Sequence, residues 1–458
     1  MSSTNVKVPM NSNNPSASWW GQLSSTARWT FLTASGAWFF DCFDQQIFNL
    51  ARGPAAKALA GSGQDATAVS AGAMAAFLVG WGIGGLFLGA LGDKIGRART
   101  LAVSVLLYAL FTGLSAFAVG AYDFAAYRFL TGIGVGGVFG LAVALIADST
   151  PAEVRPKALG TFQALSTVGN IGAGLVGLGL ASMITGVWYW KSLFLVGAIP
   201  ALIFVIAAFY LKEPEAWLKA RKDAKGIGFG SYSALLGDPR WSSRAWLALA
   251  VCSAGIIGLW GLGNFQPEVV GPVIKSHYQG LFPNIAAQEL EAKVNSVKSW
   301  ALMLQNGGGF IGMLICSWGC RRFGRKTALA SSLITSALGT MLLFKGLTSY
   351  VDIFWIIPMM GMATYAPFAA FAILLPELFP IRLRSTGPSF AYNCGRFAAA
   401  GGVIGLFFLT RFLRDVEHPE QTLENFRTAG FCMSFVPLLG LLALYFLPET
   451  KDAPLPEG

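Results

Sequence analysis

Long runs of apolar residues, separated by short polar loops, dominate the chain. Each run suits a helix of roughly 20 residues, the length that crosses ~30 Å of hydrocarbon. None shows the period-two alternation of a barrel strand. We therefore predict an all-α membrane protein with twelve transmembrane helices, near residues 28–50, 67–91, 100–120, 123–148, 158–183, 191–211, 244–270, 296–319, 327–347, 350–376, 385–411 and 427–447.

A long polar stretch divides these spans six and six, as expected for a linker between two helical bundles. Its Pro214–Lys225 portion can form a short helix on the membrane surface. The predicted parts are a polar N-terminus (1–27), an N-terminal six-helix bundle (28–211), a linker (212–243), a C-terminal six-helix bundle (244–447) and a tail (448–458).

Composition and charge agree with lipid as the solvent. Hydrophobic residues make up 54% and charged residues only 12%, against roughly a quarter charged in soluble domains. The net charge of +10 comes from short basic runs between apolar stretches, which favours anionic lipid over nucleic acid as the partner. Lys and Arg are about twice as frequent on the side that holds both termini, so we expect both termini in the cytoplasm and the chain in the inner membrane.

Two motifs recur in the second half at nearly the same offset. Gly92-Asp93-Lys94-Ile95-Gly96-Arg97 is echoed by Cys320-Arg321-Arg322-Phe323-Gly324-Arg325, and the acid, proline and arginine that follow the fourth span recur after the tenth. We infer a duplicated six-helix unit, the arrangement found in many transporters. The glycines Gly132, Gly134, Gly136 and Gly137, like Gly80, Gly84, Gly85 and Gly89, lie inside apolar helices and are expected to allow close helix packing.

The first loop motif resembles the signature loop of major facilitator transporters, and Arg128 with the glycines after it is similar to the fourth helix of that family. Pro376-Glu377 and Leu447-Pro-Glu-Thr-Lys451 resemble sugar-porter-like members. Asp41 and Asp44 resemble the Asp-x-x-Asp of sialate/lactate and aromatic-acid proton symporters. The resemblance implies the two-bundle major facilitator fold. We expect no cofactor. Arg321 departs from the aspartate of the repeated loop, which suggests a weaker latch in that half.

Charged side chains at the predicted helix ends can form a network that holds one conformation closed. They also fit a purely topogenic role. The candidates for gating are Asp93, Arg97, Asp148, Arg155, Glu377 and Arg384.

Three charged residues lie well inside spans of the first half, away from the span ends. Asp41 and Asp44 share one helical face, and Asp44 and Arg128 lie at matching depths of about 8–9 Å from the same side. Charges at such depth are costly and usually functional. An Asp41/Asp44–Arg128 cluster can bind a proton in transport, or it is a static ion pair that fixes helix packing.

Arg396 lies near the middle of the eleventh predicted span, with no carboxylate within one turn. A guanidinium there suits bidentate binding of a substrate carboxylate; the alternative is a static pair with an acid on another helix, such as Glu268. The other candidates for substrate binding are Tyr392, Asn393, Asn264, Gln266, Gln305, Asn306 and Tyr365.

These features predict a proton-coupled symporter of a small organic anion, a carboxylate of monocarboxylate, sialate or aromatic-acid type, working by alternating access. A proton-coupled sugar porter is the alternative, a drug/proton antiporter is third, and a non-transporting receptor stays open. No nucleophile cluster suggests an enzyme, and His277 and His418 lie in predicted outer loops, so we expect no metal. The expected partners are the substrate, a proton and membrane lipids, with the protein a monomer.

Overall fold

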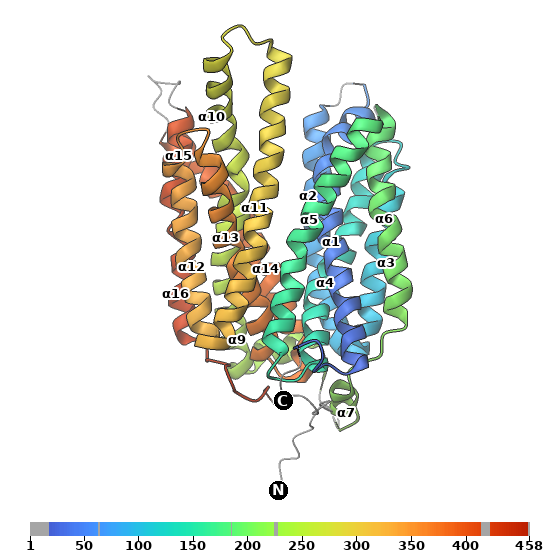
Figure 1. Ribbon diagram of the computed structural model, residues 1–458. Helices are drawn as coiled ribbons and strands as arrows, with labels where there is room; N and C mark the ends of the chain where they lie inside the picture. Colours follow the sequence, from blue (N-terminus) through green and yellow to red (C-terminus); the bar gives the residue numbers. More distant parts are fainter. Residues whose placement is uncertain (1–17, 63–64, 185, 224–227, 414–421, 457–458) are drawn as a thin grey trace. The chain divides into compact units, whose positions relative to one another are not determined.

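The computed structural model describes residues 18–62, 65–184, 186–223, 228–413 and 422–456, and every regular element among them is helical (Figure 1). Most of the predicted N-terminal tail, and His418, lie outside these ranges. The helices are α1 (Ser25–Leu59), α2 (Ala66–Ile95), α3 (Arg97–Ser115), α4 (Ala121–Ser149), α5 (Arg155–Met183), α6 (Val187–Phe209), α7 (Glu215–Asp223), α8 (Tyr232–Gly237), α9 (Pro239–Ile256), α10 (Gln266–Leu281), α11 (Ala287–Phe323), α12 (Arg325–Met341), α13 (Asp352–Leu378), α14 (Thr386–Phe412), α15 (Thr422–Met433) and α16 (Val436–Phe446).

All twelve predicted spans overlap helical segments, although the third, near 100–120, continues five residues past the end of α3 at Ser115. The seventh runs from α9 through a π-helical turn at Ile257–Leu262 into α10, and the twelfth runs from α15 into α16. Ten segments among the described residues are long and apolar enough to cross a membrane. Helices α1 and α11 have 35 and 37 residues but fall outside that set, because polar side chains such as Asp41 and Gln305 lower their mean hydropathy.

Several helices continue beyond the apolar run that predicted them. Helix α1 extends nine residues past Leu50, and α10 and α11 lengthen the seventh and eighth spans into a helical hairpin, visible in Figure 1. An apolar run marks where lipid surrounds the chain, whereas backbone hydrogen bonds carry a helix on into water. Hydropathy therefore underestimates these helices.

The described residues form two compact units. Unit 1 comprises those of 1–245, 372–393 and 450–456, and unit 2 those of 246–371 and 394–449. Unit 1 thus contains α1–α8, the start of α9 (residues 239–245), the end of α13 and the start of α14. This division follows contacts rather than chain order, and the predicted boundaries of the two six-helix bundles remain a prediction.

The linker contains two short helices, α7 and α8. Helix α7 falls where a helix was expected, within 214–225, although residues 224 and 225 are not described. Its Trp217 is buried, and the indole Nε1–H donates to the backbone oxygen of Asp93 at 3.2 Å. The linker is therefore tied to the end of α2.

Glycines allow α2 and α4 to pack backbone to backbone. A Cβ on Gly80 or Gly84 would lie 2.1 Å from the carbonyl oxygens of Phe129 and Ile133, respectively. The approach is mutual, since a Cβ on Gly132 or Gly136 would lie 2.2 Å from a carbonyl oxygen of α2. The expected packing role of these glycines is confirmed.

Replacing Gly84 with valine should destabilise unit 1, because a backbone oxygen cannot move aside as a side chain can. Overpacking of this kind typically costs about 1–3 kcal/mol, which should appear as a lower thermal unfolding temperature in detergent. Gly174→Val in α5 is the matched control, since a Cβ there meets no atom within 4 Å. Equal unfolding temperatures for the two variants would contradict this account of the packing.

Candidate functional site

The centre of unit 1 holds a buried ion pair. The carboxylate of Asp44 (α1) lies 3.8 Å from the guanidinium of Arg128 (α4), and their side chains are 1% and 0% exposed. The Thr112 hydroxyl (α3) donates to Asp44 at 2.7 Å. Two residues predicted from their matching depths, on α1 and α4, thus meet, and α3 adds a hydroxyl partner.

Arg128 is surrounded by further groups that suit a cation. It donates to the hydroxyls of Thr112 at 3.2 Å, Thr131 at 2.8 Å and Ser115 at 3.0 Å. The rings of Phe194 and Phe48 lie 4.8 and 5.2 Å from its guanidinium carbon, within cation–π range. The guanidinium therefore keeps neutral partners if the Asp44 carboxylate loses its charge.

Asp41 lies one turn before Asp44 and is fully buried. Its carboxylate accepts a hydrogen bond from the Gln45 amide at 3.3 Å, within α1. The structure therefore pairs Arg128 with Asp44, and Asp41 lies one turn earlier in α1. The hydroxyls of α3 were missed from the sequence, although Thr112 and Ser115 share the i, i+3 spacing that joins Asp41 and Asp44.

A second charged cluster lies at the end of unit 1 where α2 and α4 finish. Arg97 pairs with Asp93 at 2.9 Å and also with Asp148. Arg384, just before α14, pairs with the second oxygen of Asp148 at 2.5 Å. These four side chains are at most 3% exposed. Asp148 thus joins one arginine from the loop motif to one from a much later segment.

Asp93 also caps the start of α14. Its carboxylate accepts from the backbone N–H groups of Ser385 at 3.0 Å and Thr386 at 2.8 Å, and from the Thr386 hydroxyl at 2.8 Å. A helix N-terminus has unsatisfied N–H groups and a partial positive charge, which a carboxylate stabilises. One aspartate therefore serves both Arg97 and the end of a distant helix.

The two remaining gating candidates lie close by with other partners. Arg155 donates to the backbone oxygens of Ala147 at 2.9 Å and Thr150 at 3.3 Å, where α4 ends. Glu377, near the end of α13, accepts from the Thr450 hydroxyl at 2.5 Å. The ion pairs and hydrogen bonds given above between α2, α4 and the start of α14 involve the other four candidates.

The repeated loop motif has the same geometry in both units. Glu213 accepts from the backbone N–H groups of Arg97, Ala98 and Arg99 at 2.8–3.2 Å, where α3 begins. Glu449 accepts in the same way from Arg325 and Lys326 at 2.9 and 3.0 Å, where α12 begins.

The glycine of each motif makes these caps possible. Gly96 and Gly324 have φ angles of +126° and +104°, and a Cβ on either would lie 2.4–2.6 Å from the capping carboxylate. Only glycine adopts this backbone conformation readily. The Gly-Arg step of both copies therefore reflects a capped helix start.

The substrate candidates are distributed over the two units. In unit 2 the Tyr365 hydroxyl donates to Asn306 at 3.3 Å, and the Gln305 amide donates to the Gly263 oxygen at 3.4 Å. Gln266 is 1% exposed, and neither end of its amide has a hydrogen-bond partner among the described residues. Arg396 is half-buried and Asn264 is exposed.

In unit 1, Tyr392 stacks on Phe139 of α4 with ring centroids 3.9 Å apart. Asn393 donates to the Ser389 oxygen at 2.9 Å and lies against Gly85 of α2.

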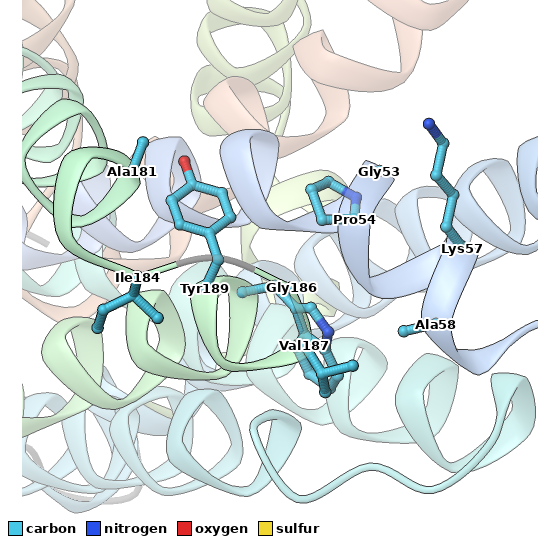
Figure 2. A pocket seen from close by; sticks show the side chains of 10 residues that line it. Gly53, Pro54, Lys57, Ala58, Ala181, Ile184, Gly186, Val187 and Tyr189 are labelled. Carbon is cyan, nitrogen blue, oxygen red and sulfur yellow. The ribbon is translucent and has the colours of Figure 1, made fainter.

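Each unit also contains an open cleft. Figure 2 shows the one in unit 1, about 680 Å³, where α1 and α5 end and α6 begins. Its wall residue Trp190 packs edge-on against Phe194, which covers Arg128. The cleft in unit 2, about 1080 Å³, lies among α10, α11, α14 and α15 and includes Glu268, Lys275 and Lys298.

Comparison with known proteins identifies the fold and the class of protein. A family model described as the Major Facilitator Superfamily matches residues 34–271, more than half of the chain. The chain belongs to this superfamily. It is therefore a multi-pass membrane transporter rather than an enzyme, and the resemblance inferred from the loop motif is confirmed.

Three relatives illustrate the match. The cis,cis-muconate transport protein of Acinetobacter baylyi is 27% identical over 74% of this chain and 81% of its own length. The gentisate transporter of Corynebacterium glutamicum is 27% identical over 79% of this chain and 77% of its own length. The solved proton:xylose symporter XylE superposes with a TM-score of 0.73 at 18% identity, covering 94% of this chain and 98% of that chain. At that identity the likeness shows the twelve-helix fold alone.

Replacing Asp148 with asparagine should destabilise unit 1 strongly, since Arg97 and Arg384 would both lose a buried carboxylate. Breaking a buried ion pair costs about 3–5 kcal/mol, to be measured as a fall in unfolding temperature in detergent. The control is Asp238→Asn, which breaks a solvent-accessible ion pair with Arg240. Exposed ion pairs contribute little to stability. If the two variants have the same unfolding temperature, Asp148 does not hold Arg97 and Arg384 together as described.

Proposed function

We propose that this superfamily member is a proton-coupled symporter of small organic anions that works by alternating access. The observation that carries the coupling proposal is the buried Asp44–Arg128 pair with its three hydroxyl partners. A carboxylate without solvent depends on its cation to remain charged, so a small change in their separation favours proton uptake. While Asp44 is protonated, Arg128 still donates hydrogen bonds to the hydroxyls of Thr112 and Ser115 on α3 and of Thr131 on α4.

The choice of an organic anion is supported by relatives and by Arg396. The muconate and gentisate carriers are named for carboxylates, and a half-buried guanidinium on α14 is suited to bind a carboxylate bidentately. The Gln266 amide, with its donor and acceptor unpartnered among the described residues, can bind a second polar group of the substrate.

The Asp93–Arg97–Asp148–Arg384 cluster is proposed as the reversible latch. It holds the start of α14 against α2 and α4 through charges and a helix cap, contacts that can break and re-form as a unit. The excess of Lys and Arg supports a cytoplasmic location for this end and for both termini, at the inner membrane. The state described here is then the one with the cytoplasmic latch closed.

The sugar-porter alternative loses part of its basis. It drew on Leu447-Pro-Glu-Thr-Lys451, and Glu449 of that motif caps α12 as Glu213 caps α3. A helix cap stabilises the fold whatever the substrate is, so this motif does not favour a sugar. Accumulation of a neutral hexose in proteoliposomes, with no effect of carboxylates, would decide for the sugar porter.

Asp44→Asn should abolish uphill accumulation while exchange continues, because the amide cannot bind the transported proton. The measurement is uptake of radiolabelled benzoate and cis,cis-muconate into proteoliposomes with an imposed pH gradient, beside exchange at equal pH. Wild-type uptake that ignores the gradient would remove the coupling proposal, and a variant that still accumulates substrate would remove Asp44 from it.

Arg396→Ala should raise the half-saturating concentration of carboxylate by about 10–100-fold, since loss of a charge-assisted hydrogen bond removes about 1.5–3 kcal/mol. Arg396→Lys should recover only part of it, because an ammonium lacks the bidentate fork. Arg321→Ala, at an exposed arginine of α11, is the control. Unchanged uptake in Arg396→Ala would contradict its binding role.

A further inference from the structure

Four aromatic rings form a continuous row inside unit 1, one from each of four helices. Phe162 (α5) stacks on Trp38 (α1) at 5.8 Å, Trp38 lies 5.4 Å from Phe139 (α4), and Phe139 stacks on Tyr392 (α14) at 3.9 Å with an interplanar angle of 16°. All four are at most 2% exposed. Neither the latch nor the ion pair uses these rings.

The contact between Phe139 and Tyr392, at one end of the row, has the close parallel stacking that a planar ligand would make with an aromatic ring. The Phe139–Tyr392 contact is the closest and among the most nearly parallel of the ring pairs described. Tyr392 reaches Phe139 from the part of α14 that Asp93 caps and Arg384 anchors. When these contacts break, the start of α14 can move away, and the covered face of Phe139 becomes available.

Trp38, the neighbour of Phe139 in the row, carries a buried hydrogen-bond donor. Its indole Nε1–H is buried and has no partner among the described residues, although a buried donor normally has one. Trp38 also precedes Asp41 by three residues, so the two share a face of α1. Trp38 therefore lies one helical turn before Asp41, the first buried acid of α1.

We propose that Phe139 and Trp38 form a slot for the planar ring of a conjugated carboxylic acid, which makes them specificity-determining residues. The substrate ring stacks on the face of Phe139 that Tyr392 covers here. Tyr392 moves away from Phe139, so that the substrate ring lies between the two side chains. Trp38 Nε1–H donates to a substrate oxygen. This inference rests on the proposed function and narrows its substrates to flat, conjugated acids.

A matched pair of acids tests the slot. Benzoate and cyclohexanecarboxylate carry the same carboxylate on six-membered rings, of which only the first is planar. Stacking should make benzoate about tenfold the better competitor of labelled cis,cis-muconate uptake in proteoliposomes. Phe139→Leu should remove this preference by weakening benzoate alone, and Phe139→Tyr should retain it. Trp38→Phe, which keeps a ring but loses the donor, should weaken both acids alike.

Tyr127→Leu is the control, because Tyr127 stacks with Phe111 at 6.4 Å, outside the aromatic row. Equal competition by the two acids in wild type, or an equal loss for both in Phe139→Leu, would overturn the slot and leave organic-anion transport standing. Absence of uptake for every carboxylate would instead refute the proposed function. If Phe139→Leu does not fold, the wild-type ratio and Phe139→Tyr still decide.

Discussion

A charged side chain inside a membrane protein must be enclosed by other groups that compensate its charge, because lipid offers none. Unit 1 meets this constraint twice, with Asp44 and Arg128 in its middle and with Asp93, Arg97, Asp148 and Arg384 at one end. Enclosure requires helices that approach closely, and glycines on α2 and α4 supply that approach. The charges thus dictate the packing around them as much as the apolar residues do.

Buried ion pairs of this kind suit a transporter better than they suit a rigid scaffold. Desolvation offsets much of their Coulomb attraction, so a complete pair adds little net stability, whereas an incomplete one is heavily penalised. In conformational transitions, elements held by such contacts can switch between discrete arrangements. The start of α14, capped by Asp93 and anchored through Arg384 and Asp148, is held in this way.

The duplicated half-motifs share one physical solution and differ in one charge. Glu213 and Glu449 each cap the helix that follows a glycine of positive φ, which explains why the glycine and the distant glutamate recur together. Asp93 has Arg321 at the matching position of the second copy, and Arg321 is exposed. The duplication therefore retained the cap, while the aspartate that holds α14 belongs to the first copy.

The sequence by itself predicted the helical spans, the repeated loop motif and the meeting of Asp44 with Arg128, because hydropathy and helical spacing are local properties of a chain. It underestimated the lengths of α1, α10 and α11. Only the tertiary structure decided that Thr112 bonds Asp44, that Asp93 caps α14 and that Tyr392 stacks on Phe139. Each of these contacts joins residues tens to hundreds of positions apart, so their geometry depends on how whole helices pack and leaves no periodic signal in the sequence.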